Sequence, residues 1–361
     1  MGWNIKSADA CELDLVSLGE CMLRLSPAAH GRIEFAPALE VWVGGGEYNV
    51  AYALARLGLR TGWVGGLNTS PMGRIIANHA RAAGMDISQA ITRPYDGVGK
   101  IDRIGLNFTE VGTSQRASTT LYDRGHSATA GIKPGEIDWH ALFHQRGVRW
   151  LHTGGIYPAL SENARQVVAE AVIAAHEAGT IVSYDLNFRS KLWSSEEAIA
   201  TTRPLVPYID CLIGNEEDFQ KVLGYEVVGV DVEKGQIDTT AFKAMAERVV
   251  ADFPGIQVVG TTLRGVKTAL VNDWSAIVWH HGTFYDGLSL PGLEIEDRVG
   301  GGDGFASGFI YGLLTGLLPQ QCVDLGVAHG ALLMSTRGDT SQITLAELNH
   351  RAQGGSARIQ R

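Results

Sequence analysis

Short apolar runs bounded by turn residues alternate with stretches of helical periodicity along most of this chain. The runs predict buried strands at residues 13–19, 60–65, 148–152, 181–185, 211–213 and 257–262. Segments such as 47–57 and 161–177 carry apolar residues at helical spacing. Strands that alternate with helices in this way are typical of a mainly parallel sheet. The chain is therefore predicted to have an α/β fold.

Two segments interrupt this alternation. Residues 23–43 and 99–124 carry irregular or alternating β patterns rich in Thr, Gly and charged residues. In an open α/β sheet the ligand binds beyond the carboxyl ends of the strands, where β insertions would cover it. We therefore expect one domain over 1–361, with these two segments inserted as a lid. Residues 224–236 are polar and contain several glycines, which predicts a long surface loop.

Charge argues against nucleic acid as a partner. The formal net charge is -9, and no long Lys/Arg run is present. An anionic small substrate would therefore have to be held by a few local arginines. The cysteines have no paired spacing of the kind that a disulfide framework or a zinc site requires, so we expect a reducing cytoplasm. They are Cys11, Cys21, Cys211 and Cys322.

No membrane or export segment is expected. The N-terminal residues lack the apolar core of a signal peptide. Residues 305–318 are apolar but short and rich in glycine, which predicts a buried core helix rather than a membrane span.

The segment 297–303 has the sequence Asp-Arg-Val-Gly-Gly-Gly-Asp and precedes a predicted helix at 305–317. Glycines at a helix N-terminus leave backbone N–H groups free to bind an anion. Phosphoryl transfer to an alcohol needs such donors together with a base near the hydroxyl, and Asp303 could be that base. The alternative is an ordinary glycine-rich turn in which Asp303 caps the helix. This segment alone supports both interpretations.

A second glycine cluster, at residues 44–46, precedes Glu47 and Asn49 where another helix is predicted to begin. The backbone could approach a sugar closely there, and Asn49 could bind a hydroxyl. The alternative is a simple strand-to-helix turn. Neither cluster has the GxxxxGK[ST] or GxGxxG spacing, which argues against two common nucleotide-binding folds.

Together, the two clusters resemble the PfkB (ribokinase-like) family of carbohydrate kinases. Residues 45–49 match its GG-x-x-N pattern, and residues 297–303 match its D-x-x-G-x-G-D pattern. The resemblance extends over about 13–350. It implies a ribokinase-like three-layer sandwich with a mainly parallel central sheet and a small β-sheet lid. It further implies ATP and Mg²⁺ as cofactors, allows a monovalent cation, and makes a homodimer the default, because lid strands in this family often pair between subunits.

The same resemblance assigns the catalytic roles. Asp303 becomes the general base. The backbone amides of the preceding glycines become the anion hole; they are Gly300, Gly301 and Gly302.

Within that family the chain looks most like the 2-keto-3-deoxygluconate kinases. The similarity lies in the motifs at 19–22, 122–128, 185–193 and 297–303. It implies transfer of the ATP γ-phosphoryl group to a primary hydroxyl of 2-keto-3-deoxygluconate, giving 2-keto-3-deoxy-6-phosphogluconate. The implied substrate-binding residues are Gly45, Gly46, Asn49, Asn107, Tyr122, Arg124, Asn187 and Arg189.

Two of these residues, Arg124 and Arg189, suit a sugar acid. The planar guanidinium of arginine can bind a carboxylate through two parallel hydrogen bonds. The alternative is that both are structural or surface arginines.

The chain departs from the family pattern at three places. Asn107 stands where many of these kinases have an aromatic lid residue. Where the family has the pattern N-x-x-E, this chain has Asn215-Glu216-Glu217-Asp218, so Asn215, Glu217 and Asp218 are expected to organise Mg²⁺ through water. Where the family has a glycine-rich turn near ATP, this chain has residues 262–265. The expected nucleotide-binding residues are Asn215, Thr262, Arg264 and Gly265.

Other functions remain open at this point. A PfkB kinase for fructose or a related keto sugar would not need Arg124 or Arg189. A non-catalytic sugar-binding regulator would not need Asp303. A nicotinamide dehydrogenase is disfavoured by the missing dinucleotide fingerprint at residues 18–21. His329 stands where the family lines its adenine pocket, but a lone histidine on a helix predicts a structural role.

Overall fold

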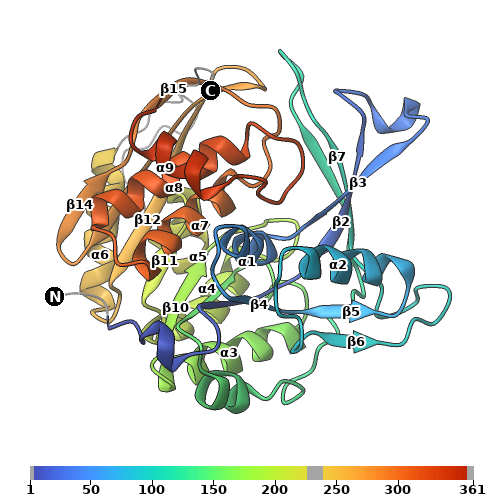
Figure 1. Cartoon of the computed structure of the whole chain (residues 1–361), viewed down its shortest axis with the longest axis horizontal. Coiled ribbons are helices and arrows are strands. Elements are labelled where there is room, and N and C mark those ends of the chain that lie inside the picture. Colours follow the sequence, from blue (N-terminus) through green and yellow to red (C-terminus); the bar gives the residue numbers. More distant parts are fainter. Residues whose placement is uncertain (1–3, 226–238, 356–361) are drawn as a thin grey trace.

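The central sheet follows the strand order β14-β13-β12-β11-β10-β9-β1-β4, with β15 paired to β13 (Figure 1). The computed structural model describes residues 4–225 and 239–355. Within this sheet, β12, β11, β10, β9, β1 and β4 run parallel to one another. The strands β13, β14 and β15 are attached by antiparallel pairing. The prediction of a mainly parallel sheet is therefore confirmed. The strands are β1 (Leu15–Leu18), β4 (Thr61–Val64), β9 (Trp150–Gly154), β10 (Ile181–Asp185), β11 (Cys211–Ile213), β12 (Val258–Val266), β13 (Val271–His280), β14 (Thr283–Asp286) and β15 (Leu290–Glu294).

Helices cover both faces of this sheet and make three layers. Successive strand residues point to opposite faces, so Leu15 joins one buried cluster and Val16 the other. The first cluster packs under α1 (Gly46–Arg56), α2 (Pro71–Ala82), α7 (Gly301–Leu314) and α8 (Pro319–Leu333). The second packs under α3 (Glu162–Glu177), α4 (Ser195–Thr202), α5 (Glu216–Leu223) and α6 (Thr239–Asp252). The helix α9 (Leu345–Ala352) packs on α8.

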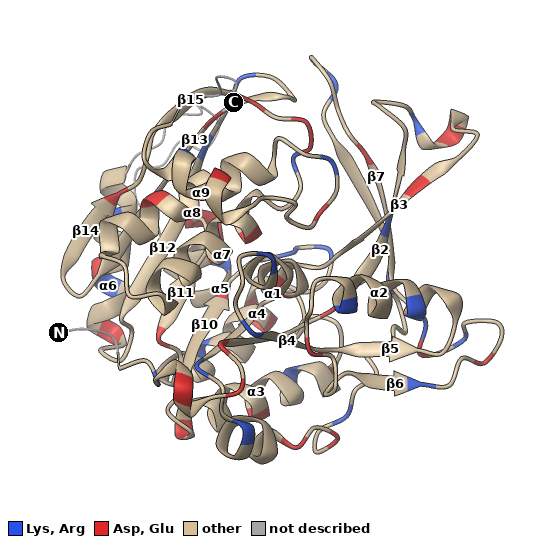
Figure 2. Ribbon diagram, in the orientation of Figure 1, with Lys and Arg blue, Asp and Glu red and all other residues tan. Residues whose placement is uncertain are grey.

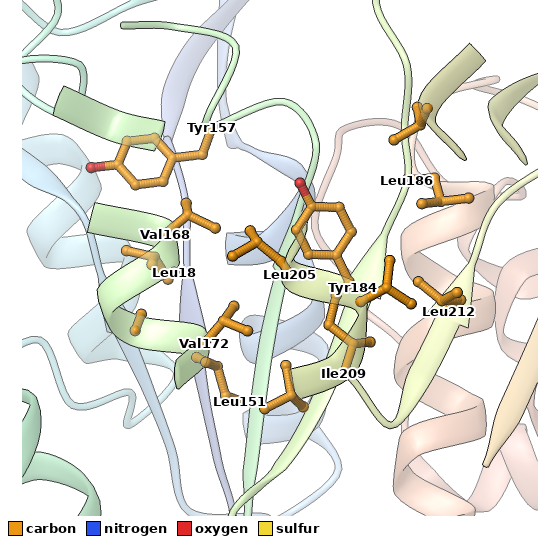
Figure 3. Close-up of a cluster of buried hydrophobic side chains, with 14 of the residues drawn as sticks. Leu18, Leu151, Tyr157, Val168, Val172, Tyr184, Leu186, Leu205, Ile209 and Leu212 are labelled. Carbon is orange, nitrogen blue, oxygen red and sulfur yellow. The ribbon is translucent and has the colours of Figure 1, made fainter. Parts of the chain in front are cut away.

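Figure 3 shows part of the second core, where strand residues meet a helix. Leu151 and Tyr184 project from β9 and β10 toward Val168 and Val172 of α3. Each of these four side chains has 1% or less of its surface exposed. This dry contact fixes the carboxyl ends of both strands relative to each other.

A separate four-stranded sheet has the order β3-β2-β7-β8. Its strands are β2 (Met22–Pro27), β3 (Leu39–Gly44), β7 (Leu106–Glu110) and β8 (Thr119–Asp123). Both interrupting segments of the sequence supply strands to it, and it stands away from the central sheet at the upper right of Figure 1. The prediction of a small separate β-sheet is confirmed. A further pair, β5 (Gly66–Asn68) and β6 (Ile91–Arg93), lies beside α2.

Shorter helical turns complete the chain that the structure describes. They are η1 (Ala8–Ala10), η2 (Ile33–Phe35), η3 (Ala141–Gly147) and η4 (Arg203–Tyr208). Gly224, the first residue of the predicted surface loop at 224–236, ends α5 in the left-handed conformation at φ 78°. Most of that predicted loop cannot be compared with the structure, because residues 226–238 lie outside the described residues.

Charged residues of both signs are interspersed over the ribbon (Figure 2). Among the described helices, none is long and apolar enough to cross a membrane. The apolar segment that begins near residue 305 is instead the buried part of α7, as predicted.

Candidate active site

A cavity of about 730 Å³ lies beyond the carboxyl ends of the parallel strands. After β1 the chain pairs β4 on one side, and β9 later pairs on the other side, so the strand order reverses at β1. Such a reversal opens a crevice in which α/β proteins bind ligands. The cavity is lined by residues from the central sheet, the four-stranded sheet and the N-terminus of α7.

The two glycine motifs meet in this cavity. Asn49 Nδ2 donates a hydrogen bond of 2.7 Å to Asp303 Oδ2, across 254 residues of sequence. Asn49 is itself oriented by Gly45, whose backbone N–H donates to Asn49 Oδ1 at 3.2 Å. Gly45 must be glycine, because a Cβ there would lie 2.0 Å from the carbonyl oxygen of Glu20. The N-terminal motif thus orients the carboxyl group of the C-terminal one.

The C-terminal motif places free amides beside that carboxyl group. Helix α7 begins at Gly301, four residues earlier than predicted, because Gly300 adopts the left-handed conformation at φ 83° and ends the preceding turn. Asp303 is therefore inside the first turn, and the alternative that it is the N-cap is wrong. No side chain caps the first N–H groups of α7. These groups face the cavity and can bind an anion.

The electrostatics around Asp303 favour a carboxyl that can take up a proton. Burial raises the pKa of Asp303, while the hydrogen bond from Asn49 and the charge of Arg189 oppose this rise. Burial therefore makes this carboxyl more basic than a solvated aspartate, and Asn49 and Arg189 limit the increase.

Asp297, the first residue of the motif, does not line the cavity. It accepts a hydrogen bond of 2.5 Å from Arg24 of β2, and Arg24 also contacts Asp339 at 3.4 Å. Asp297 Oδ1 further accepts the N–H of Val299 at 3.3 Å, which shapes the glycine turn. The four-stranded sheet is therefore attached to the base of this turn by a buried arginine.

At the four-stranded sheet, Arg124 lines the cavity with Tyr122 and Asn107. Arg124 is paired with Glu20, through Nε at 2.8 Å and Nη2 at 2.5 Å, and its guanidinium lies 5.3 Å from the centre of the Tyr122 ring. Asn107 is 7% exposed and accepts a hydrogen bond from Thr109 at 3.2 Å. Arg124 is thus a fixed guanidinium with donors left for a ligand.

Glu47 also lines the cavity, and the charges of Glu20 and Asp303 act on its carboxyl group. Gly19 and Gly154 make room for it, because a Cβ at either position would lie within 3.0 Å of its carboxyl oxygens. Burial raises the pKa of Glu47 to about 7, and the charge of Asp303 adds to the rise. The cavity therefore contains a buried acid whose pKa lies near neutral pH.

Asn187 and Arg189 follow β10 and line the cavity. Asn187 has a positive φ of 35°, a strained conformation that recurs at functional sites. Arg189 is exposed and donates to the carbonyl oxygen of Phe188 at 2.9 Å, which leaves its remaining donors facing solvent or ligand.

Asn215 and Asp218 form a capping box at the start of α5. Asn215 Oδ1 accepts the N–H of Asp218 at 2.9 Å, and Asp218 Oδ2 accepts the N–H of Asn215 at 3.0 Å. Asp218 Oδ1 also accepts the N–H of Phe188 at 2.9 Å. Glu217 lines the cavity without such a contact to another described residue.

The prediction of a glycine-rich turn at residues 262–265 is wrong. These residues belong to β12 and pair with β13 from Thr262↔Ala276 to Gly265↔Asp273. Antiparallel pairing satisfies their backbone groups, so the chain continues straight instead of turning. Thr262 and Arg264 line the cavity, whereas Gly265 does not.

His329 is buried away from the cavity, as its predicted structural role requires. Its two ring nitrogens contact Ser307 Oγ at 2.9 Å and Ser341 Oγ at 2.8 Å. Burial lowers its pKa to about 4, which keeps the ring neutral.

Sequence reasoning did not select six charged residues that line the cavity. They are Glu20, Glu47, Asp185, Glu216, Arg298 and Asp339. All of them except Asp339 lie inside motifs that were recognised, so their positions were a usable signal. Asp339 gave none, because an acid in a loop is ordinarily solvated.

The comparisons with known proteins agree with this geometry. Residues 12–345 match the family described as pfkB family carbohydrate kinase. A 2-dehydro-3-deoxygalactonokinase of Haloferax volcanii is 34% identical over 350 residues, which cover 96% of this chain and 99% of that protein. A 5-dehydro-2-deoxygluconokinase of Shouchella clausii is 28% identical over 347 residues, covering 95% of this chain and 97% of that protein.

A solved structure is similar over the same range. The crystal structure of 2-dehydro-3-deoxygluconokinase from Thermotoga maritima has a TM-score of 0.88 and 37% identity, and the match covers 95% of this chain and 100% of that one. The three-layer fold with a small separate sheet is thus the ribokinase-like fold. The chain belongs to the pfkB family of carbohydrate kinases, related to the 2-dehydro-3-deoxy sugar kinases, and is an ATP-dependent phosphotransferase with an alcohol group as acceptor.

Proposed function

We propose that this enzyme transfers the γ-phosphoryl group of ATP to the primary hydroxyl of 2-keto-3-deoxygluconate, also called 2-dehydro-3-deoxygluconate, giving 2-keto-3-deoxy-6-phosphogluconate. The observation that carries the proposal is the contact of 2.7 Å between Asn49 and Asp303, which holds a carboxyl beside the uncapped amides of α7. A base and an anion-binding turn within one cavity are the parts that phosphoryl transfer to an alcohol needs.

The roles follow from this arrangement. Asp303 takes the proton of the sugar hydroxyl as its oxygen attacks the γ-phosphorus. The bond between that phosphorus and the bridging oxygen breaks, and its electron pair leaves with ADP. The amides of Gly300, Gly301 and Gly302 stabilise the charge that develops on the transferring oxygens.

The preference for a sugar acid rests on two arginines of the cavity. Arg124, oriented by Glu20, and Arg189, after β10, are the proposed partners of the substrate carboxylate. The remaining proposed sugar contacts are Gly45, Gly46, Asn49, Asn107, Tyr122 and Asn187. The named relatives differ at the configuration of one carbon, gluco or galacto, so the epimer has to be measured.

The residues at the other end of the cavity fit a nucleotide with Mg²⁺. Thr262 and Arg264 of β12, with Asn215, which caps α5, line the cavity and are the proposed nucleotide contacts. Among the described residues, no group of three or more His, Cys, Asp or Glu is placed to hold a metal directly. Both oxygens of Asp218 already accept backbone N–H groups, so Glu217 and Asp218 would hold Mg²⁺ through its water shell. Bound there, Mg²⁺ would neutralise phosphate charge.

The four-stranded sheet is the proposed lid. Its residues Asn107, Tyr122 and Arg124 line the sugar end of the cavity. Closure over the sugar would exclude water, which otherwise competes with the sugar as phosphoryl acceptor.

The test is an ADP-release assay over a sugar panel, with product identified by mass spectrometry. The panel contains 2-keto-3-deoxygluconate, its galacto epimer, fructose, ribose and adenosine. We expect the highest kcat/KM with 2-keto-3-deoxygluconate. A higher value for a neutral sugar would refute the carboxylate assignment, and sugar binding without ADP release from any substrate would indicate a non-catalytic regulator.

A further inference from the structure

Two arginines flank the glycine turn at the nucleotide end of the cavity. Arg264 projects from β12, and Arg298 immediately follows Asp297 in the turn motif. Both line the cavity. The Arg264 guanidinium packs against the turn, since a Cβ on Gly301 would lie 2.9 Å from Arg264 Nη2. Glycine at this position therefore lets a guanidinium reach the start of α7.

Neither arginine is neutralised by a carboxylate of the part of the chain that the structure describes. Arg264 lies 5.2 Å from the Trp274 ring centre and donates only to Met334 Sδ, at 3.5 Å. Arg298 is exposed, and no hydrogen bond or ion pair joins it to another residue in 4–225 or 239–355.

Other arginines of the interior are neutralised. Arg24 pairs with Asp297, and Arg124 with Glu20. Arg149 pairs with Asp14 at 3.1 Å. Compensation of buried guanidinium groups is the rule in this molecule, as it is in proteins generally.

Two adjacent positive charges in a partly enclosed cavity repel each other. Burial lowers the pKa of Arg264 to about 10, and the nearby charge of Arg298 adds to this decrease. A protein of formal net charge -9 has acidic residues available to neutralise the pair. Leaving both charges free is favourable overall only if a ligand with several negative charges binds between them.

We propose that Arg264 and Arg298 bind the phosphoryl oxygens of the nucleotide next to Gly300–Gly302, and that Arg298 is a further catalytic residue of this enzyme. The proposal rests on the phosphoryl transfer described above. Arg264 is held in place by Trp274 and Met334, so it binds the nucleotide before reaction. Arg298 is untethered and can follow the γ-phosphoryl group as it moves from ADP to the sugar oxygen. It therefore stabilises charge that is largest in the transition state.

The test separates binding from turnover. Nucleotide affinity is measured by titrating ADP and ATP calorimetrically without sugar, and kcat is measured with whichever panel sugar is turned over. Arg298→Ala should lower kcat by about 10²-fold to 10³-fold while ADP affinity changes by less than about threefold. Arg298→Lys should restore part of the lost kcat, because it keeps the charge.

For Arg264 the expected pattern is the reverse. Arg264→Met should weaken ADP and ATP binding by about tenfold or more, and Arg264→Lys should weaken it less. Arg81→Ala, on the exposed side of α2, is the matched control and should change neither quantity. Thermal melting of each variant identifies those that are unfolded.

Several outcomes would overturn the proposal. Wild-type kcat in Arg298→Ala removes its catalytic role, and wild-type ADP affinity in both Arg264 variants removes the phosphate site. If Arg264→Met is unfolded, the Arg264→Lys titration decides. Because the titrations need no sugar, they remain valid if the preferred sugar is not 2-keto-3-deoxygluconate, so failure of one proposal is distinguishable from failure of the other.

Discussion

Asn49 donates a hydrogen bond of 2.7 Å to Asp303, and this contact joins α1 to the first turn of α7. The donor favours the ionised carboxylate, because it satisfies a lone pair that would otherwise be buried unpaired. Asn49 therefore tunes Asp303 as well as orienting it.

Replacing Asn49 should move the pH profile of the enzyme. Asn49→Leu removes the donor that lowers the pKa of Asp303, so that pKa rises further. A base must be ionised to act, so activity is lost as pH falls through the raised pKa. The acid limb of kcat/KM should shift to higher pH by about one unit. Asn78→Leu, exposed on α2, should leave the limb in place. An unchanged limb in Asn49→Leu would mean that another group controls it.

Replacing the proposed base, Asp303, should abolish most turnover without abolishing binding. Asp303→Asn keeps the shape of the side chain but cannot accept the proton, so kcat should fall by about 10²-fold to 10⁴-fold. Sugar binding, measured by calorimetry, should persist. Asp286→Asn, which lies outside the cavity on β14, should have wild-type kcat. Retention of near wild-type turnover in Asp303→Asn would remove it from the mechanism.

The arginine at the four-stranded sheet should discriminate acid from neutral sugars. Arg124→Gln should raise KM for 2-keto-3-deoxygluconate by about tenfold or more, since a charge-assisted hydrogen bond is lost. KM for fructose should change less. Arg124→Lys should fall between wild type and Arg124→Gln, because lysine keeps the charge without the planar fork. Equal effects on both sugars would show that Arg124 does not contact the carboxylate.

The buried Arg24 should be needed for stability. Arg24→Met leaves Asp297 and Asp339 buried without their counter-charge, which should lower the free energy of unfolding by about 3–5 kcal/mol. Urea unfolding followed by circular dichroism measures the loss. The exposed Arg81→Met should stay within about 0.5 kcal/mol of wild type. A loss as small in Arg24→Met as in the control would contradict the pairing.

The acid Glu47 should make stability depend on pH. Its pKa is about 7 in the folded protein, compared with 4.5 for an ordinary solvated glutamate, so the folded state holds the proton more tightly than the unfolded state. Stability linked to this group is complete below the lower value and is lost as pH rises through the upper one. At about pH 8, Glu47→Gln should be more stable than wild type by about 1–3 kcal/mol, whereas near pH 4 the two should agree. Urea unfolding at both pH values measures this, and a difference independent of pH would instead indicate an ordinary packing effect.

The strands and the two motifs could be predicted because their signals are local. β10 and β11 were predicted with their observed bounds, since each is a short apolar run between turn residues and is buried from both faces. Asn49 and Asp303 were both selected, each from its own glycine cluster. That they touch could not be predicted, because the contact depends on how α1 and α7 pack.

Other features depend on distant partners and left no local trace. β12 continues through Arg264 because β13 pairs with it, although the glycine at 265 had suggested a turn. Glu47 is buried because Gly19 and Gly154, on two other segments, leave space for its carboxyl. The pairing of Arg24 with Asp297 spans 273 residues. The burial and the contacts of such residues can be identified only when the packed structure is known.

The distance in sequence between Asn49 and Asp303 has a consequence during synthesis on the ribosome. The N-terminal motif emerges early, but its partner lies 254 residues later. Until α7 has left the exit tunnel, the nascent chain has neither the proposed base nor the proposed anion-binding turn, and a sheet built from parallel strands of high sequence separation closes slowly. Phosphotransfer activity should therefore appear only with nearly full-length chains.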